Sequence, residues 1–166
     1  MRLEFSAGGV VYKREKTRKG DDKRKNAKGI YILVSQHSMH HGWVFPKGLI
    51  GDHIEGEKKS ASAKGFGETK EEAAVREVKE ETGIEAKIIR ALEPVTYWYV
   101  LEGEKIKKTV YYYIMEFIGG DTEKRDFEME NVEWLPIDEV LERLSYKSDK
   151  KVFEIAKEVI KKLVIE

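Results

Sequence analysis

Cysteine is absent from this sequence of 166 residues, which excludes disulfide bonds, thiolate metal sites and a cysteine nucleophile. Long apolar runs are absent as well: no stretch approaches the eighteen or so residues of a membrane span, and the first residues lack the apolar core of a signal peptide. Neither sign of charge is in excess, with 31 basic and 31 acidic residues, so the composition indicates no general nucleic-acid-binding surface. These absences predict a soluble cytoplasmic protein without a membrane partner.

No linker rich in proline, glycine or serine divides the chain, which has three prolines in all. Its length is sufficient to bury one core, and we expect a single domain over residues 1–166. Alternating apolar residues predict strands, and apolar residues three or four apart predict helices. The expected strands are 3–12, 30–35, 86–92, 95–101, 107–117 and 132–135, and the expected helices are 69–82, 136–144 and 151–164.

The same pattern predicts a hairpin turn and a buried face on the last helix. Residues 102–104 would join two strands as a hairpin. The last helix has an apolar stripe that we expect to pack in the core. The stripe consists of Val152, Ile155, Ala156, Val159, Ile160 and Leu163.

The first expected helix carries the most informative pattern in the chain. Thr69 is its candidate N-cap and Gly83 follows its last residue, which are ordinary start and stop signals. Residues three or four apart share a helix face, so Glu77, Glu80 and Glu81 would crowd three carboxylates onto one side. Like charges so placed repel, whereas a hard divalent cation turns the repulsion into coordination by oxygen ligands. The pattern predicts a Mg²⁺ site, which Mn²⁺ could also fill.

An ordinary solvated helix is the alternative explanation of these residues. Lysine and glutamate are abundant in the chain, and Arg76 with Glu80 would form a common ion pair one turn apart. Composition alone does not account for so many positions at fixed spacing between Glu68 and Ile84. The functional interpretation is therefore favoured.

Residues 68–84, ETKEEAAVREVKEETGI, resemble the second half of the Nudix box. The box opens with a glycine six residues before its first glutamate, where this chain has Ser62. Residues 45–48, FPKG, match the Pro-Lys-Gly that commonly precedes this loop in the family. We therefore interpret Gly48 as the displaced opening glycine and residues 49–66 as an expanded loop.

The Nudix resemblance implies a fold, an activity and a metal site. The fold is α+β, an α/β/α sandwich with a central mixed β-sheet. The activity is hydrolysis of a pyrophosphate linked to an organic group by metal-activated water. By this resemblance Glu77, Glu80 and Glu81 hold Mg²⁺, and Gly48 belongs to the same site. Glu77 is our choice for orienting or deprotonating the water, although the sequence does not separate ligand from base.

Other residues of the box would support this chemistry. We expect Arg76 to orient a glutamate through a two-pronged pair rather than to touch substrate. Glu68 would brace the loop and the start of the helix, and Gly83 would end it. By the same resemblance Glu128, which lies six residues before Trp134, is a further metal ligand or an alternative base. A solvated acidic loop is the alternative, because several other glutamates lie nearby.

Two segments are similar to diadenosine polyphosphate hydrolases within the family: residues 40–48, HHGWVFPKG, and residues 107–111, KKTVY. Lys47 and Lys108 would supply mobile charges for the phosphate chain. A tyrosine ring could stack an adenine, although alternation in strands turns many tyrosines into the core or to an outer face. Our choices for this contact are Tyr99, Tyr111 and Tyr146. They come from the rings of Tyr97, Trp98, Tyr99, Tyr111, Tyr112, Tyr113 and Tyr146.

The favoured substrate is accordingly a dinucleoside polyphosphate such as diadenosine tetraphosphate or hexaphosphate. The alternatives are an oxidised nucleoside triphosphate, an RNA 5′ pyrophosphate, a nucleotide sugar, or binding without catalysis as a nucleotide sensor. A site without catalytic activity would have no physical reason to keep three mutually repelling carboxylates. This disfavours the role of a non-catalytic nucleotide sensor. We expect a small nucleotide partner, no nucleic acid other than an RNA 5′ end, and a monomer or homodimer.

Two segments rich in charge or small residues have no predicted regular structure. Residues 13–29 are expected to form a mobile hairpin loop, with phosphate gathering as the less favoured role. Residues 49–66 lie between the phosphate lysine and the metal helix, so they could fold over the substrate as a lid. A surface insertion without such a role is the favoured alternative.

Overall fold

The computed structural model describes all residues except 16–19, 21–28, 52–66 and 166. Most of the charged hairpin loop and most of the expanded loop therefore lie outside the described residues. The mobility expected of the first and the lid role considered for the second stay predictions, as does the single-domain organisation.

Eight strands form one mixed sheet in the described part of the chain. They are β1 (Arg2–Arg14), β2 (Ile30–His37), β3 (Trp43–Val44), β4 (Lys47–Leu49), β5 (Ile84–Ala91), β6 (Val95–Leu101), β7 (Glu104–Gly120) and β8 (Met129–Pro136). All six strands expected from the sequence are confirmed, most of them a few residues longer. The two short strands β3 and β4 were not expected.

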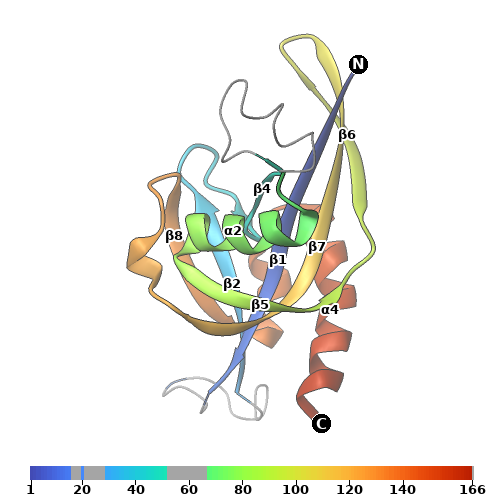
Figure 1. Cartoon of the computed structure of the whole chain (residues 1–166). Coiled ribbons are helices and arrows are strands. Elements are labelled where there is room, and N and C mark those ends of the chain that lie inside the picture. The colour runs from blue at the N-terminus through green and yellow to red at the C-terminus, as the bar shows by residue number, and fades with distance from the viewer. Residues whose placement is uncertain (16–19, 21–28, 52–66, 166) are drawn as a thin grey trace.

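The sheet runs in the order β3-β2-β1-β7-β5, with β4 beside β1, β6 beside β7 and β8 beside β2. The central pair β1 and β7 is parallel, and the other described pairs are antiparallel. Figure 1 shows β1 in dark blue running through the middle of the molecule. The β4 strand lies against β1 at Gly8 and so brings Lys47 to the centre of the fold.

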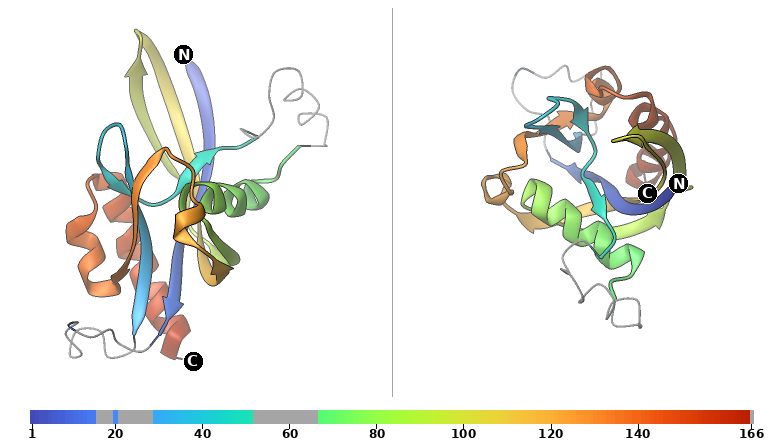
Figure 2. Two further views of the ribbon diagram at one scale, coloured as in Figure 1. Left: turned by 90° about the vertical axis from the view of Figure 1, so that its left-hand side faces the viewer. Right: turned by 90° about the horizontal axis from the view of Figure 1, so that it is seen from above.

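Helices cover both faces of the sheet. α2 (Lys70–Thr82) lies on one face and α4 (Lys147–Ile165) on the other, as Figures 1 and 2 show. α3 (Val140–Arg143) is a single short turn before α4. The predicted α/β/α sandwich with a central mixed sheet is confirmed. No helix of the described residues is long and apolar enough to cross a membrane.

Each face of the sheet has its own core because side chains alternate along the strands. Val10 and Tyr12 of β1 pack in the core beneath α4, which includes the fully buried Phe153. Val11, between them, packs in the core beneath α2 together with Val78. The two cores fix both helices against one sheet. The end of α2 and the start of α4 border one cavity.

The start and end of α2 confirm the expected signals. Thr69 caps the helix: its side chain accepts from the Glu72 amide while the Glu72 side chain accepts from the Thr69 amide. Gly83 ends it with a φ of 79°, a left-handed conformation that favours glycine. A Cβ on Gly83 would lie 2.0 Å from the Asp121 carbonyl oxygen, so packing also requires glycine there.

Two helix predictions need correction. Pro136 ends β8 and is followed by a 3-10 turn, Ile137–Glu139, and then by α3, so residues 136–144 are not one helix. α4 begins at Lys147 rather than at residue 151. Ile155 is 56% exposed, whereas Phe153 is fully buried. Two residues are separated by about 200° around a helix, so the buried face that includes Phe153 turns Ile155 to solvent.

The hairpin between β6 and β7 is confirmed with a shorter turn than expected. Glu102 and Gly103 alone form it, with φ angles of 51° and 80°, and Glu104 already belongs to β7. Two successive positive φ angles are typical of tight hairpins, because their twist matches that of the strands. Figure 1 shows the hairpin projecting beyond the rest of the sheet beside the N-terminus.

Candidate functional site

Arg76 lies midway along α2 and joins three carboxylates. Its Nε and Nη2 atoms donate to the two oxygens of Glu68 at 2.5 and 2.9 Å. Its Nη1 atom donates to Glu77 at 2.7 Å and to Glu80 at 2.8 Å. Nη2 also reaches the Leu49 carbonyl oxygen at 3.2 Å. The two-pronged contact is made with Glu68, and the fork ties the preceding loop to the acidic face of the helix.

Replacing Arg76 by lysine is expected to lower the free energy of unfolding by about 2 kcal/mol. A single ammonium group cannot serve three carboxylates at once, and the Glu68 side chain is only 5% exposed. Urea unfolding without metal measures the change. Arg143→Lys is the control. Among the acidic residues that the structure describes, Arg143 pairs with the half-exposed Glu133 alone, and the substitution should change stability by less than about 0.5 kcal/mol. Equal losses would contradict the cluster's structural role.

Glu77 and Gly48 approach each other closely across α2 and β4. Gly48 pairs with Ala7 on β1, which turns its Cα toward the helix. A Cβ on Gly48 would lie 2.1 Å from the Cδ and Oε2 atoms of Glu77. The Glu77 side chain is 5% exposed. The carboxylate therefore occupies a cradle that exists because residue 48 has no side chain.

Glu81 lies one turn further along α2, between the helix and the centre of the fold. Its Oε1 atom accepts a hydrogen bond from the Lys47 backbone amide at 3.1 Å. Burial, followed by the negative charges of Glu77 and Asp126, raises the pKa of Glu81 to about 8, against the opposing effect of Lys47. The carboxyl group is thus protonated near neutral pH until a cation compensates its charge.

The donor atoms on α2 suit a hard divalent cation. As the side chains lie, no three acidic or histidine side chains within the described residues are grouped closely enough to hold a metal, because Arg76 takes up Glu77 and Glu80. The groups present nevertheless fit Mg²⁺ or Mn²⁺: three carboxylates on one helix face, with the Gly48 cradle beside one of them. Glu77, Glu80 and Glu81 are the residues that would hold the ion.

Glu128 is not among the groups that the structure brings to these carboxylates. Its side chain is exposed, and its described contacts are through the backbone, where its carbonyl accepts from the Ser38 amide at 3.0 Å. Asp126 lies closer: its amide donates to the Glu80 carbonyl at 2.8 Å and its charge acts on Glu81. Counting back six residues from Trp134 reaches Glu128 and not Asp126, which lies two residues earlier in the chain.

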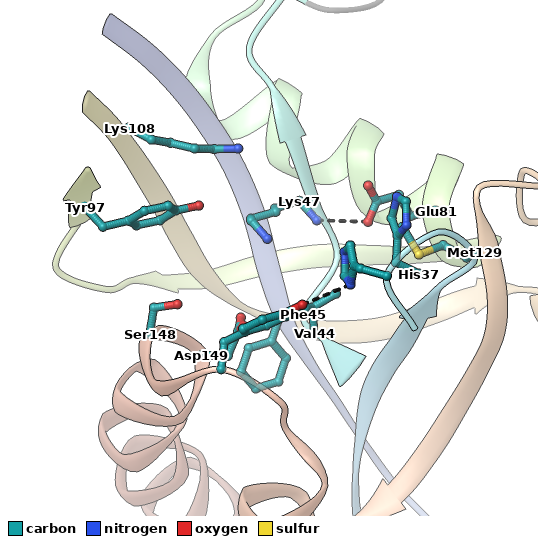
Figure 3. Close-up of a pocket in the computed structure, with 12 residues that line it drawn as sticks. His37, Val44, Phe45, Lys47, Glu81, Tyr97, Lys108, Met129, Ser148 and Asp149 are labelled. Carbon is teal, nitrogen blue, oxygen red and sulfur yellow. Dashed lines mark hydrogen bonds between the residues drawn. The ribbon is translucent and has the colours of Figure 1, made fainter. Parts of the chain in front are cut away.

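A cavity of about 500 Å³ opens beside Glu81. It lies between the sheet and the start of α4, and Figure 3 shows the labelled side chains around it. The lining residues are His37, His40, Val44, Phe45, Lys47, Glu81, Tyr97, Lys108, Met129, Tyr146, Ser148 and Asp149. Its volume is that of a typical small-ligand site.

Two lysines give the cavity a positive interior. Lys47 and Lys108 come from β4 and β7, on either side of β1, and Figure 3 shows both pointing toward the space between Tyr97 and Glu81. Burial, followed by the positive charge of Lys47, lowers the pKa of Lys108. Two ammonium groups held close together are disfavoured unless an anion lies between them, so the cavity suits a ligand with several phosphates.

Aromatic rings form one wall of the cavity. The rings of His37 and His40 stack with centroids 4.4 Å apart, and the Tyr146 ring meets His40 edge-on at 5.7 Å. The His40 Nδ1 atom accepts from the Gly42 amide and is 3.0 Å from the Tyr146 hydroxyl oxygen. Burial, followed by the charge of His37, lowers the pKa of His40. The sequence did not predict this stack.

Asp149 is a buried acid in the cavity that sequence reasoning missed. Burial raises its pKa, and Lys47, the Phe45 amide and the Tyr112 hydroxyl oppose that shift. The Tyr112 hydroxyl donates to Asp149 at 3.4 Å. The signal was an acidic residue in the first turn of α4, which was hidden because the helix begins earlier than its apolar pattern indicates.

The structure separates two of the predicted tyrosines from the cavity. Tyr99 donates its hydroxyl to Glu4, and Tyr111 packs in the core beneath α2, with Lys70 over its ring. Tyr146 does line the cavity, and so does Tyr97, the neighbour of Tyr99 on the same face of β6. Tyr111 points away because adjacent positions of a strand face opposite sides of the sheet.

Comparison with known proteins gives a consistent match. The family model described as the NUDIX domain matches residues 21–155. A protein of Mycobacterium tuberculosis provisionally named mutator protein MutT4 is 41% identical over 121 residues, which cover 73% of this chain and 43% of that protein. The 8-oxo-(d)GTP phosphatase of Mycolicibacterium smegmatis is 32% identical over 123 residues, 74% of this chain and 32% of that one. The chain spans less than half the length of these relatives.

A solved structure supports the fold. The crystal structure of a C. elegans Ap4A hydrolase binary complex aligns with a TM-score of 0.62 and 20% identity, covering 95% of this chain and 97% of that one. Identity this low shows a shared fold and leaves the substrate undetermined.

Proposed function

This chain belongs to the Nudix family, and we propose that it is a Mg²⁺-dependent hydrolase of nucleotide pyrophosphates. The observation that carries the proposal is the position of Glu81, which belongs both to the acidic face of α2 and to the lining of the lysine-containing cavity. A phosphate chain bound by the lysines would lie beside the metal-binding helix. Mn²⁺ is expected to substitute for Mg²⁺, since both accept oxygen ligands.

The residues of the site would have three roles: phosphate binding, activation of water and positioning of the base. Lys47 and Lys108 bind the phosphates as mobile point charges, and Glu77 orients or deprotonates the attacking water. Arg76 holds Glu77 in place without touching substrate. Mg²⁺, when bound, neutralises phosphate charge and lowers the pKa of water. The buried Glu77 in its cradle beside Gly48 is better fixed than Glu80, whose side chain is 45% exposed, so it suits the role of base.

The favoured substrate is a dinucleoside polyphosphate, cleaved to a mononucleotide and the remaining nucleoside polyphosphate. The paired lysines support a chain of several phosphates, and the ring wall of His40 and Tyr146 supports a stacked base. The open cavity leaves room for a second nucleoside outside it. Tyr99 and Tyr111 drop out of the proposed substrate site, and Tyr97 replaces them.

An oxidised nucleoside triphosphate is the second candidate. Two observations favour it: the names of the mycobacterial relatives and the buried Asp149 carboxylate in the cavity. A carboxylate accepts hydrogen bonds from the N–H groups at the edge of a guanine-type base. Asp149→Asn, which exchanges an acceptor oxygen for a donor, is therefore expected to raise KM for the oxidised guanine substrate.

Mg²⁺ binding is expected to release a proton at pH 7. The pKa of Glu81 is raised from 4.5 to about 8, so its carboxyl group must lose a proton before it can act as a ligand. The apparent Mg²⁺ affinity should fall as pH decreases below about 8 and level off above it. By the same linkage, the metal-free protein should lose stability as pH rises from about 4.5 to about 8, because the folded state holds the proton more tightly.

Calorimetric titration of Mg²⁺ at pH 7, in two buffers of different ionisation enthalpy, measures the released proton. Glu81→Gln has no carboxyl proton to lose at this position and is the control. Binding to the unchanged protein without proton release would contradict the raised pKa.

The substrate experiment incubates the purified protein and Mg²⁺ with diadenosine tetraphosphate and hexaphosphate, 8-oxo-dGTP, dGTP, a nucleotide sugar and 5′-triphosphorylated RNA. Chromatography identifies the products, with Glu80→Gln in parallel. Preferred cleavage of the dinucleotides that collapses in the variant supports the favoured substrate. Preferred cleavage of 8-oxo-dGTP replaces it with the second candidate. Nucleotide binding without cleavage of any substrate would contradict the enzymatic proposal.

A further inference from the structure

β6 has an unusual composition for a strand at the edge of a sheet. Its seven residues, Val95–Leu101, read VTYWYVL and include no charged residue, proline or glycine. It pairs with β7 on one side, and no described strand pairs with its other side. Edge strands usually carry lysine, proline or a bulge that prevents pairing with another chain. β6 has none of these protections.

The exposed side chains of β6 form an apolar row. Val100 is 68% exposed and Trp98 is 48% exposed. Both residue types are strong strand formers. The hairpin that contains them projects away from the helices in Figures 1 and 2. The row and the backbone edge beside it are therefore accessible to another molecule.

The sequence of β6 is chemically symmetric about Trp98. Tyrosines flank it at 97 and 99, β-branched residues follow at 96 and 100, and aliphatic residues end the strand at 95 and 101. In an antiparallel pair of identical strands centred on Trp98, tryptophan would face tryptophan, tyrosine would face tyrosine and valine would face leucine, while Thr96 and Val100 would share only their branching at Cβ. A twofold contact between identical chains requires such self-complementarity.

We propose that two copies of this chain associate by antiparallel pairing of their β6 strands, with Trp98 of each copy at the twofold axis. The pairing extends the sheet across both copies and gives hydrogen-bond partners to the backbone N–H and C=O groups at the open edge of β6. It also places Tyr99 of one copy opposite Tyr97 of the other. Because Tyr97 lines the cavity, the second copy reaches the border of the site.

The charged residues nearest the proposed axis are two lysines of the neighbouring strand. Lys105 and Lys107 lie one strand away on β7, with their amino groups 4.6 and 5.5 Å from the centroid of the Trp98 ring. With Trp98 of each copy at the axis, these lysines of both copies lie around the paired tryptophans, each amino group over the ring of its own copy, while the pairing strands themselves carry no charge.

The register of the pairing is tested by single cysteines, which the absence of native cysteine makes unambiguous. In Trp98→Cys the two introduced thiols would face each other across the axis, with Cβ atoms about 5 Å apart, and mild oxidation should link most of the protein as dimers. In Val100→Cys the two thiols would be offset by four residues, about 13 Å, and should not link. Equal linking of the two variants, or none in either, would overturn the proposed register.

The association itself is tested by sedimentation of the unmodified chain over a concentration series. We expect a reversible dimer that is lost in Val100→Lys, because the new charge lies in the pairing strand. Ile118→Lys, an equally drastic change at a residue 61% exposed on β7, should leave the dimer intact. Circular dichroism confirms that both variants are folded. A monomer at every concentration, or a dimer unchanged by Val100→Lys, would overturn the proposal.

Discussion

Replacing Glu77 by glutamine is expected to lower kcat by about 10²- to 10⁴-fold. The substitution keeps the shape of the side chain but removes the negative charge of the carboxylate. This carboxylate lies in the Gly48 cradle and accepts a hydrogen bond from Arg76 at 2.7 Å. The result has the same sign whether Glu77 acts as base, as ligand or as both. Steady-state hydrolysis of the preferred substrate measures it. KM should change far less if Glu77 acts mainly in the transition state.

Glu72→Gln is the matched control for this variant. It removes the same charge from the same helix, but Glu72 is exposed and serves the capping box, where a glutamine side chain can also accept. Activity of Glu72→Gln should stay close to that of the unchanged protein. Comparable losses in both variants would show that the charge of α2 as a whole matters rather than the position of Glu77.

Gly48→Ala is expected to abolish most activity while the protein remains folded. The added methyl group would lie 2.1 Å from the Glu77 carboxyl group, a distance that cannot persist. The carboxyl group is the end of a flexible side chain, so it moves aside at modest cost to the fold. What is lost is its position, and a displacement of about 1 Å at a reacting centre can cost about 10²-fold in rate.

Gly119→Ala on β7 provides the control for this prediction, because an added Cβ there meets its nearest atom at 3.5 Å. Thermal unfolding and Mg²⁺ binding should accompany the kinetics. We expect Gly48→Ala to lose Mg²⁺ affinity with little change in Tm. Full activity, or unfolding without a specific loss of metal binding, would argue against the cradle as part of the site.

The acidic helix could be predicted from the sequence because its determinants are local. The capping box of Thr69 and Glu72, the left-handed Gly83 and the spacing of Glu77 and Glu81 all act within a few residues. Gly48 was also singled out from the sequence, through the motif around it. Its approach to Glu77 required the structure, since the two positions meet by the pairing of β4 with β1.

The cavity could not be predicted in full because it is built from residues far apart in the chain. His40 meets Tyr146 across 106 positions, and Asp149 enters through a helix whose first turn has little apolar pattern. Tyr111 was misplaced relative to Tyr97 because strand alternation decides which face a ring occupies, and the face depends on the register of the whole sheet.

Both proposed substrates would bind in the same cavity. As proposed, a dinucleotide and an oxidised triphosphate would each need Lys47 and Lys108 to compensate phosphate charge. They differ in what lies beyond the phosphates and in the edge of the base, where Asp149 and the His40 wall would discriminate. The proposed β6 contact adds Tyr99 of a second copy near Tyr97.

The most direct test of the account is a crystal structure of the protein with Mn²⁺ and a non-hydrolysable nucleotide. Anomalous scattering locates the metal independently of any assumption about its ligands. We expect the metal at Glu77, Glu80 and Glu81, with the phosphates against Lys47 and the base inside the cavity. Metal bound away from α2, or a nucleotide outside the cavity, would contradict the assignment of the site.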